Sequence, residues 1–170
     1  MNSPAPEPIP ESDCPLIRSR GDFTAAVVWT VRSAIGQGAR HIVCTGDGFG
    51  DWPLDDAGLL DALGPWLRLP MRRLSMLGRD FESVRSQHPR FSTWRRDYGH
   101  ALEAWTPPEE MGQLPTLIVS DTALSLQLVD SVHWRGRVSS DERKAHLLRE
   151  QVDAFLQRSE RAFPVHHLGL

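Results

Sequence analysis

The sequence has 170 residues, of which 40% are hydrophobic and 24% are charged, and its formal net charge is −3. These values are typical of one globular domain with an apolar core, and they exclude a disordered chain. The small negative charge gives no overall attraction to nucleic acid or to anionic membranes, and no apolar run approaches the roughly 18 residues that a membrane-spanning helix needs.

The N-terminal half alternates helical and strand patterns after a proline-rich start. Residues 1–18 contain five prolines, which predict a disordered leader before a single domain over residues 19–170. Asp22 is the expected N-cap of a helix over Phe23–Ile35, in which apolar residues recur every four positions. The next expected elements are a buried strand over His41–Thr45, a helix over Asp56–Arg68 and a strand over Arg72–Leu77.

The C-terminal half predicts further strands between helices. A helical segment over Asp80–Tyr98 is interrupted near His88–Pro89, because proline disrupts a helix. The last helix is expected to start at a capping box of Ser139 and Glu142, to end near Arg161, and to precede a docked tail, Phe163–Leu170. The expected strands are Ala101–Trp105, Thr116–Ser120 and Ala123–Val129. This order predicts an α/β fold, in which helices pack on a mixed β-sheet.

The segment Leu114–Asp121 has eight residues and ends in an aspartate between two expected strands. In length and position it resembles the His-x-Lys-x4-Asp motif of phospholipase D-like domains, and the preceding helices and strands follow the order of that family. The resemblance covers roughly residues 22–135, one repeat. In the family, the histidine is the nucleophile toward a phosphodiester, and the lysine and aspartate help to hold charge and orientation.

Two of the three motif positions depart from the family. Leu114 stands where the histidine would be and Thr116 where the lysine would be. Leucine cannot be a nucleophile and threonine carries no positive charge, so only Asp121 carries over, and aspartate is equally suited to a turn. The family's active site also needs two repeats. The resemblance therefore implies a degenerate single repeat that would have to form a homodimer to build the related cleft.

A glycine-rich loop, Gly46–Pro53, follows the first buried strand, at the position where open α/β sheets usually bind ligands. Its three glycines would let backbone amides approach an anion, and Asp47 and Asp51 could hold a hard cation such as magnesium. The loop has neither the lysine of a phosphate-binding loop nor the spacing of a dinucleotide fingerprint. A solvated turn rich in glycine and aspartate is the alternative explanation.

Charge is segregated along the chain. His41–Ala62 holds five acids and no lysine or arginine, whereas Arg72–Arg96 holds seven arginines and two acids. Trp94, Arg95, Arg96 and Tyr98 combine cations with aromatic surface, a mixture that suits a phosphate backbone or stacked bases. The alternative is a helix face that is solvated by arginine and partly paired with the acidic segment.

Two further residues complete the candidate site. His100 could act with Asp47 and Asp51 in a metal-assisted reaction, and Arg135 could line the same end of the sheet as the glycine-rich loop. The enzyme hypothesis gains support if Asp47, His100, Asp121 and Arg135 converge in one pocket, and it loses support if they scatter.

Cysteines, overall composition, the N-terminus and tryptophans give further expectations about cofactors, location and partners. Cys14 and Cys44 have no spacing typical of a zinc site and are not expected to pair, and no cofactor is predicted. Arginine outnumbers lysine 18 to 1, which indicates a bacterial type of composition. The N-terminus lacks the pattern of a signal peptide, which predicts a cytoplasmic protein. Trp52 and Trp94 are the tryptophans expected at the surface, where they would mark a partner.

Three functions follow from these patterns. The first is a non-catalytic α/β binding or regulatory module of phospholipase D-like character, which works through a protein partner or through self-association. The second is a binder of phosphate esters or nucleic acid that uses the Arg/Trp-rich segment. The third is a metal-assisted hydrolase. We favour the first, and hence no enzymatic activity, because Leu114 and Thr116 occupy the catalytic positions of the related family.

Overall fold

A computed structural model describes residues 4–164 of the chain, and within them eight strands form one sheet. The strands are β1 (Leu16–Ile17), β2 (His41–Thr45), β3 (Arg73–Leu77), β4 (Leu102–Thr106), β5 (Thr116–Ser120), β6 (Ser125–Asp130), β7 (Arg135–Ser139) and β8 (Glu160–Arg161). Their spatial order is β1-β7-β6-β5-β2-β3-β4-β8. Only the pairs β2–β3 and β3–β4 are parallel within this sheet. The predicted α/β fold with a mixed sheet is confirmed.

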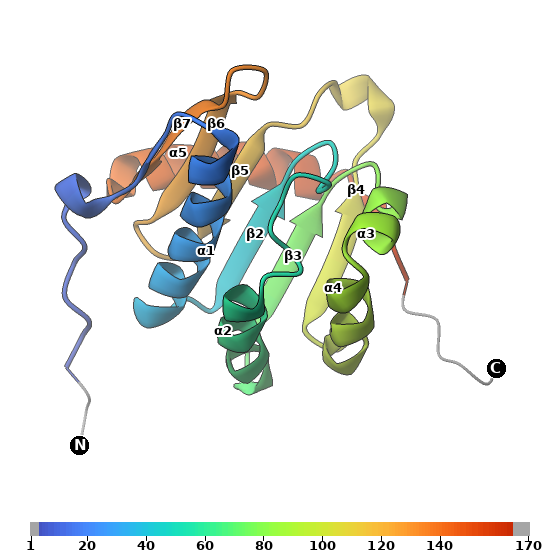
Figure 1. Cartoon of the computed structure of the whole chain (residues 1–170), viewed down its shortest axis with the longest axis horizontal. Helices are drawn as coiled ribbons and strands as arrows, with labels where there is room; N and C mark the ends of the chain where they lie inside the picture. The colour runs from blue at the N-terminus through green and yellow to red at the C-terminus, as the bar shows by residue number, and fades with distance from the viewer. Residues whose placement is uncertain (1–3, 165–170) are drawn as a thin grey trace.

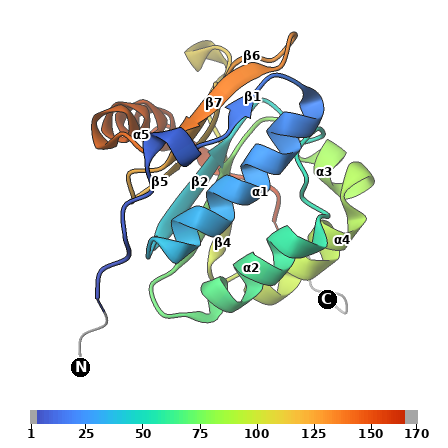
Figure 2. The ribbon, with the colours of Figure 1, turned by 60° about the vertical axis from the view of Figure 1, so that its left-hand side comes forward.

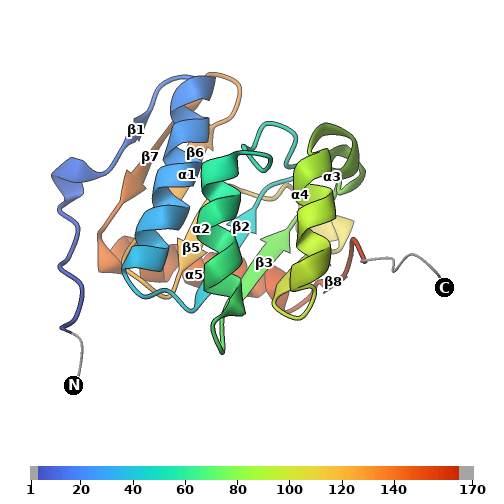
Figure 3. The same cartoon turned by 60° about the horizontal axis from the view of Figure 1, so that its bottom comes forward.

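Helices cover both faces of the sheet. One face carries α1 (Arg20–Gly36), α2 (Ala57–Arg68), α3 (Glu82–Gln87) and α4 (Pro89–Trp94), which lie in front of the sheet in Figure 1 and side by side in Figure 3. The opposite face carries α5 (Glu142–Leu156), as the turned view in Figure 2 shows. Short 3-10 helices lie at η1 (Glu11–Asp13), η2 (Arg95–Tyr98) and η3 (Glu109–Met111).

The strand side chains divide the core into two apolar layers. In β2, Ile42 and Cys44 belong to the larger cluster beneath α1 and α2, whereas Val43 belongs to the smaller cluster beneath α5. Successive side chains of a strand point to opposite faces, so a strand buried on both faces must be apolar along most of its length. This explains why β2 and β5 were recognisable as continuous apolar runs.

The start of the chain is more regular than the predicted leader. β1 pairs with β7, and the carbonyl oxygen of Pro15 accepts a hydrogen bond from the Val138 N–H. Proline lacks a backbone donor but keeps its acceptor, so it does not prevent pairing at the edge of a sheet. The Glu11 carboxylate accepts hydrogen bonds from the Ser140 N–H and from the Arg137 guanidinium, each at 2.7 Å. These contacts attach residues 11–17 to the body.

The first long helix begins earlier than predicted. Ser19, not Asp22, is the N-cap of α1, because the Ser19 hydroxyl accepts the Asp22 N–H at 3.0 Å. Asp22 lies in the first turn, where its carboxylate accepts the Arg18 N–H at 3.0 Å. A serine three residues before an acid is therefore the signal that marks this helix start.

The last helix was also misplaced at both ends. Asp141 is the N-cap of α5, Ser139 is the last residue of β7, and the helix ends at Leu156 rather than near Arg161. The Ser139 hydroxyl instead accepts the Asp141 N–H at 3.1 Å, which stabilises the turn before the helix. β7 was not predicted, because Arg135 and its neighbours form a mostly polar segment.

The three parallel strands give the sheet two chemically distinct edges. β2, β3 and β4 end at the upper edge in Figure 1, which we call the carboxyl edge, and begin at the opposite amino edge. On this face, α1 and α2 begin toward the carboxyl edge and end toward the amino edge, so their N-termini and C-termini lie toward opposite edges of the sheet. Among residues 4–164, no helix is long and apolar enough to cross a membrane.

Candidate functional site

The glycine-rich loop at the carboxyl edge is anchored in the core. Phe49 and Trp52 are 0% and 4% exposed, and their rings meet edge to face. Phe49 also stacks on Phe81, and Trp52 meets Phe23 of α1. The prediction that Trp52 lies at the surface is wrong, because the loop folds its aromatic side chains inward to cover the end of the sheet.

The two aspartates of this loop contact different arginines. The Asp47 carboxylate accepts the Arg79 guanidinium at 3.2 Å and the Leu114 N–H at 3.0 Å. Asp51 pairs with Arg20 of α1 at 3.0 Å. In the described residues, no group of three or more His, Cys, Asp or Glu side chains could hold a metal ion. The loop therefore uses its aspartates to tie neighbouring segments together.

The three positions that correspond to the phospholipase D-like motif lie at the two ends of β5. Leu114 is 3% exposed and packs with Leu117 and Val152 beneath α5, while Thr116 is half-buried at the carboxyl edge. Asp121 lies at the amino edge, where its carboxylate accepts the N–H groups of Arg40 at 2.9 Å and His41 at 3.3 Å. Asp121 thus fixes the start of β2.

The Arg/Trp-rich segment divides into a structural and an exposed part. Arg95 is 6% exposed, and its guanidinium donates to the carbonyl oxygens of Phe163 at 2.8 Å and Pro164 at 3.1 Å. It also lies 3.5 Å from the centre of the Phe163 ring. Burial lowers the pKa of Arg95 to about 10, with a further contribution from Arg85 and Arg96. Arg95 is therefore held inside the protein, and only Arg96 of the pair is exposed.

Trp94 and the start of the tail are also partly inside. Trp94 is half-buried between Phe91 and Tyr98, with its ring centre 4.5 Å from that of Tyr98. Phe163 is 7% exposed and stacks on Phe81, as expected for a docked tail, while residues 165–170 lie outside the described residues. The Arg/Trp-rich segment does not form one continuous exposed surface.

The amino edge carries a strongly cationic groove. It encloses about 550 Å³ and is formed by the C-terminal end of α2, the following loop, and the starts of β2, β3 and β4. We call it the amino-edge groove; its basic lining residues are Arg40, Arg68, Arg72, Arg73, His41 and His100. Within the described part of the chain, none of its lining residues is acidic.

A second groove of about 600 Å³ adjoins the first, because His100 lines both. We call it the tail groove, since it lies between β4 and the segment Arg161–Pro164. Arg95 and Arg96 line it together with Asp97 and Glu103. Arg95, Arg96 and His100 are thus the predicted site residues that the structure brings together.

One lining residue of the amino-edge groove, His41, makes a serine–histidine contact that the sequence did not suggest. The ring Nε2 of His41 lies 2.9 Å from the hydroxyl oxygen of Ser75. Burial, followed by the nearby charge of Arg73, lowers the pKa of His41. Ser75 lies in the middle of β3 and is only 2% exposed, so its hydroxyl is closed to a substrate.

The remaining predicted residue lies far from the grooves in the sheet. Arg135 begins β7, near the opposite end of the strand order, and its guanidinium donates to the Arg18 carbonyl oxygen at 2.7 Å. Asp47 lies at the carboxyl edge, whereas Asp121 and His100 lie at the amino edge beside different strands. The four residues that would support the enzyme hypothesis scatter instead of converging.

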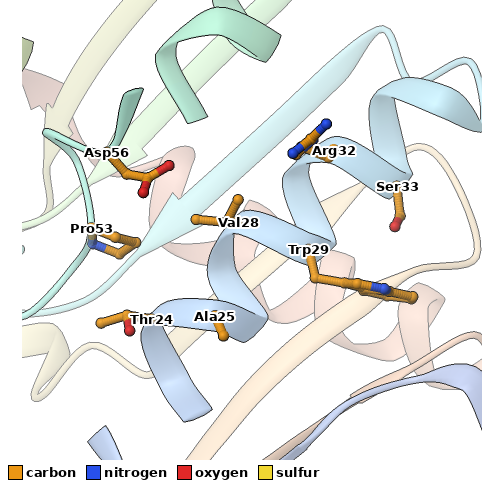
Figure 4. A pocket seen from close by; sticks show the side chains of 8 residues that line it. All are labelled: Thr24, Ala25, Val28, Trp29, Arg32, Ser33, Pro53 and Asp56. Carbon is orange, nitrogen blue, oxygen red and sulfur yellow. The ribbon is translucent and has the colours of Figure 1, made fainter. Parts of the chain in front are cut away.

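A different groove lies between α1 and the loop before α2. It encloses about 640 Å³, and Figure 4 shows Val28 projecting from α1 toward Pro53 of the loop, while the Trp29 ring extends away from Pro53. Arg32 and Asp56 supply its charged groups, one of each sign. No predicted site residue lines this groove, and its charge is balanced.

No protein-family model matches the chain, and no curated protein matches it either. The fold is phospholipase D-like, as shown by similarity to a solved phospholipase D family member, Nuc from Salmonella typhimurium. The two share 12% identity with a TM-score of 0.53 over 84% of this chain and 93% of the other.

The chain is also similar to TrmBL2, an archaeal chromatin protein whose structure is described as showing a novel mode of DNA binding. Here the identity is 15% and the TM-score 0.58, over 86% of this chain and 54% of the other. The chain therefore spans about half the length of that structure. At these identities, both similarities establish the fold alone, and they confirm the fold expected from the order of elements in the sequence.

Sequence reasoning missed the arginines of the amino-edge groove. Arg40 immediately precedes β2, Arg68 ends α2, and Arg72 precedes β3. Arg72 opens the arginine-rich segment Arg72–Arg96, but Arg40 lies 32 residues before it, and no local pattern joins the two. A signal was nevertheless present, because residues at the starts of successive parallel strands must meet at one edge of the sheet.

Proposed function

We propose that this protein is a non-catalytic binding module with a phospholipase D-like fold, and that it binds a phosphate-containing ligand. The observation that carries the proposal is the state of the carboxyl edge. The position of the family's nucleophile holds a buried leucine, Leu114, whose N–H donates a hydrogen bond to the Asp47 carboxylate. The Thr45 hydroxyl donates to the Pro115 carbonyl oxygen at 2.6 Å and attaches the same segment to β2.

This arrangement favours binding over hydrolysis. A buried aliphatic side chain cannot attack phosphorus, and Thr116 supplies no fixed positive charge to a phosphoryl group. His41 and Ser75 offer the described serine–histidine contact, but the serine is enclosed by the sheet. The scaffold is therefore suited to hold a ligand without cleaving it.

The arginines favour a phosphate-containing ligand. Guanidinium groups bind phosphate oxygens through paired hydrogen bonds, and four of them line the amino-edge groove. The DNA binding described for TrmBL2 and the membership of Nuc in the phospholipase D family are consistent with phosphate chemistry on this fold.

The proposal is tested by measuring hydrolysis and binding with the same protein. We expect no release of nitrophenol from bis(p-nitrophenyl) phosphate and no shortening of labelled oligonucleotides, with and without magnesium. Hydrolysis that persists in purified protein and is lost in Thr116→Ala or His41→Asn would refute the non-catalytic proposal. Absence of binding to any phosphate-containing probe at low salt would refute the other part.

Self-association remains a separate prediction, as does the cytoplasmic location. The resemblance implied that a single repeat forms a homodimer. Size-exclusion chromatography with light scattering tests this directly, because a monomer at all concentrations would contradict it.

A further inference from the structure

The amino-edge groove and the tail groove adjoin at His100, and we call the two together the cationic path. Seven arginines line the two grooves, against two acids, Asp97 and Glu103. Glu103 lies 3.5 Å from the Arg73 guanidinium and 3.4 Å from that of Arg161, so it is already paired. The path therefore keeps a local excess of positive charge in a protein whose net charge is −3.

Several of these guanidinium groups are available. In residues 4–164, the side chains of Arg40 and Arg96 are exposed and form none of the ion pairs or side-chain hydrogen bonds found in the structure. Arg68 donates to the Tyr98 hydroxyl at 3.0 Å, which leaves its charge uncompensated. Arg72 donates to the Pro70 carbonyl oxygen, and its buried Nε has no hydrogen-bond partner among the described residues.

We propose that this path binds the phosphate backbone of a single-stranded nucleic acid, an inference that rests on the proposed phosphate-binding function. Cations that follow a groove match the repeating charge of a polynucleotide better than the single charge of a small phosphate ester. The arginines come from α2, η2, β8 and the starts of β2 and β3, so they lie along the two grooves rather than at one point. Exposed apolar side chains at its rim, Leu69 and Met71, offer surface to unstacked bases.

The concave shape of the path favours a single strand over an anionic bilayer or a nucleic-acid duplex. A bilayer is contacted by protruding basic and apolar residues, whereas here Arg72 and His41 lie partly buried inside the groove. A duplex is usually entered by a protruding helix or ribbon, but the cations at this edge come from element ends and a recessed loop.

Fluorescence anisotropy of a fluorescein-labelled 20-nucleotide oligothymidylate tests the inference. The groove variant combines Arg40→Glu, Arg68→Glu and Arg96→Glu, and the control variant combines Arg18→Glu, Arg32→Glu and Arg143→Glu. All six arginines are exposed, and both variants change the net charge equally, but none of the control residues lines either groove. Circular dichroism and thermal melting verify that each variant is folded, and Arg→Gln replaces Arg→Glu in a set that does not fold.

We expect the groove variant to raise the Kd for the oligonucleotide at least about tenfold at low salt and to reduce the salt slope of log K by about 2, since each phosphate contact contributes about 0.7. The control variant should change the Kd less than about threefold. Equal weakening by both variants would overturn the inference, because it would indicate general attraction of charge. A duplex bound more tightly than the single strand, or binding only to phosphatidylserine vesicles, would also overturn it.

The test separates this inference from the proposed function. If the wild type binds inorganic pyrophosphate or another phosphate-containing probe but not the oligonucleotide, the binding function stands and the nucleic-acid inference fails. If the protein hydrolyses the oligonucleotide, the non-catalytic proposal fails, while the difference between the groove and control variants still decides where the strand binds.

Discussion

Replacement of Arg95 by alanine distinguishes a structural arginine from a binding one. The sequence placed Arg95 and Arg96 together in a candidate interface, but only Arg95 is buried, with its guanidinium between the Phe163 ring and two carbonyl oxygens. Arg96 is exposed and makes no such contacts within the described residues. The neighbouring pair therefore provides its own matched control.

The size of the effect follows from these contacts. Each hydrogen bond from a charged donor contributes about 1.5–3 kcal/mol, and a desolvated cation over an aromatic ring adds about 2 kcal/mol. Burial of the guanidinium offsets a large part of this sum, as the lowered pKa of Arg95 indicates. We expect a net loss of about 2–3 kcal/mol in the free energy of unfolding, which corresponds to about 5–10 °C in Tm.

Urea unfolding and thermal melting of Arg95→Ala and Arg96→Ala measure the difference. Arg96→Ala should remain within about 0.5 kcal/mol of the wild type, as surface substitutions usually do. If the two variants are equally stable, Arg95 does not hold the tail against α3 and η2, and the packing argument is wrong.

Three further predictions concern the backbone, a histidine and the N-terminal segment. Gly136→Ala should lower the free energy of unfolding in urea by about 1–3 kcal/mol, because the added Cβ would collide with the Gln127 carbonyl in β6. Gly36→Ala should be neutral or slightly stabilising, because a Cβ there meets no atom of the described residues within 4 Å. The pKa of the His41 imidazole, measured by NMR, should lie below 6.5. Its contribution to stability is then complete above pH 6.5 and declines as the pH falls from 6.5 toward the folded pKa, because in that range the unfolded state binds a proton that the folded state does not. A pKa at or above 6.5 would contradict this. Glu11→Gln should weaken the attachment of residues 11–17 by about 1 kcal/mol and speed hydrogen exchange at the Ser140 amide; unchanged exchange would show that Glu11 is not the anchor.

The sequence predicted the elements that are buried on one or both faces. β2 and β5 are short apolar runs, and α2 has a clear stripe of leucines, so burial alone identifies them. The interruption at His88–Pro89 was also predicted correctly, since α4 starts at Pro89. Such features depend on the residues within one segment, which is the information that a single sequence contains.

The errors occur where a partner segment determines the structure. β7 contains two arginines and a glycine, and it is a strand because β6 and β1 hydrogen-bond to it on both sides. Gly136 lets its backbone approach Gln127 closely, which no local pattern reveals. Ser139 has the spacing of a capping box with Glu142, but pairing with β6 retains Ser139 in the strand and leaves Asp141 to cap the helix.

The candidate site was predicted less well than the fold, for a similar reason. Trp94, Arg95 and Arg96 are adjacent in the sequence, yet a short helical turn sends their side chains into different environments. Arg40 is distant in the sequence from Arg68 and Arg72, yet all three line one groove. A function carried by residues from several elements depends on strand order, and the sequence did not determine that order.

The fold places several acids at helix N-termini and the arginines of the amino-edge groove near helix C-termini. Acids of the Asp47–Asp80 region accept hydrogen bonds from backbone N–H groups at the starts of helices: Asp56 from Leu59 in α2, Asp55 from Phe91 in α4 and Asp80 from Ser83 in α3. Helix N-termini attract anions, so these charges are satisfied locally. Helix C-termini at the amino edge favour cations, and four arginines there line a groove with no acid among its described residues. Of these four, only Arg73 is paired with an acid of the described residues, Glu103. A chain with a net charge of −3 can therefore present a cationic groove. The net charge of the whole chain is thus no argument against nucleic-acid binding at this edge.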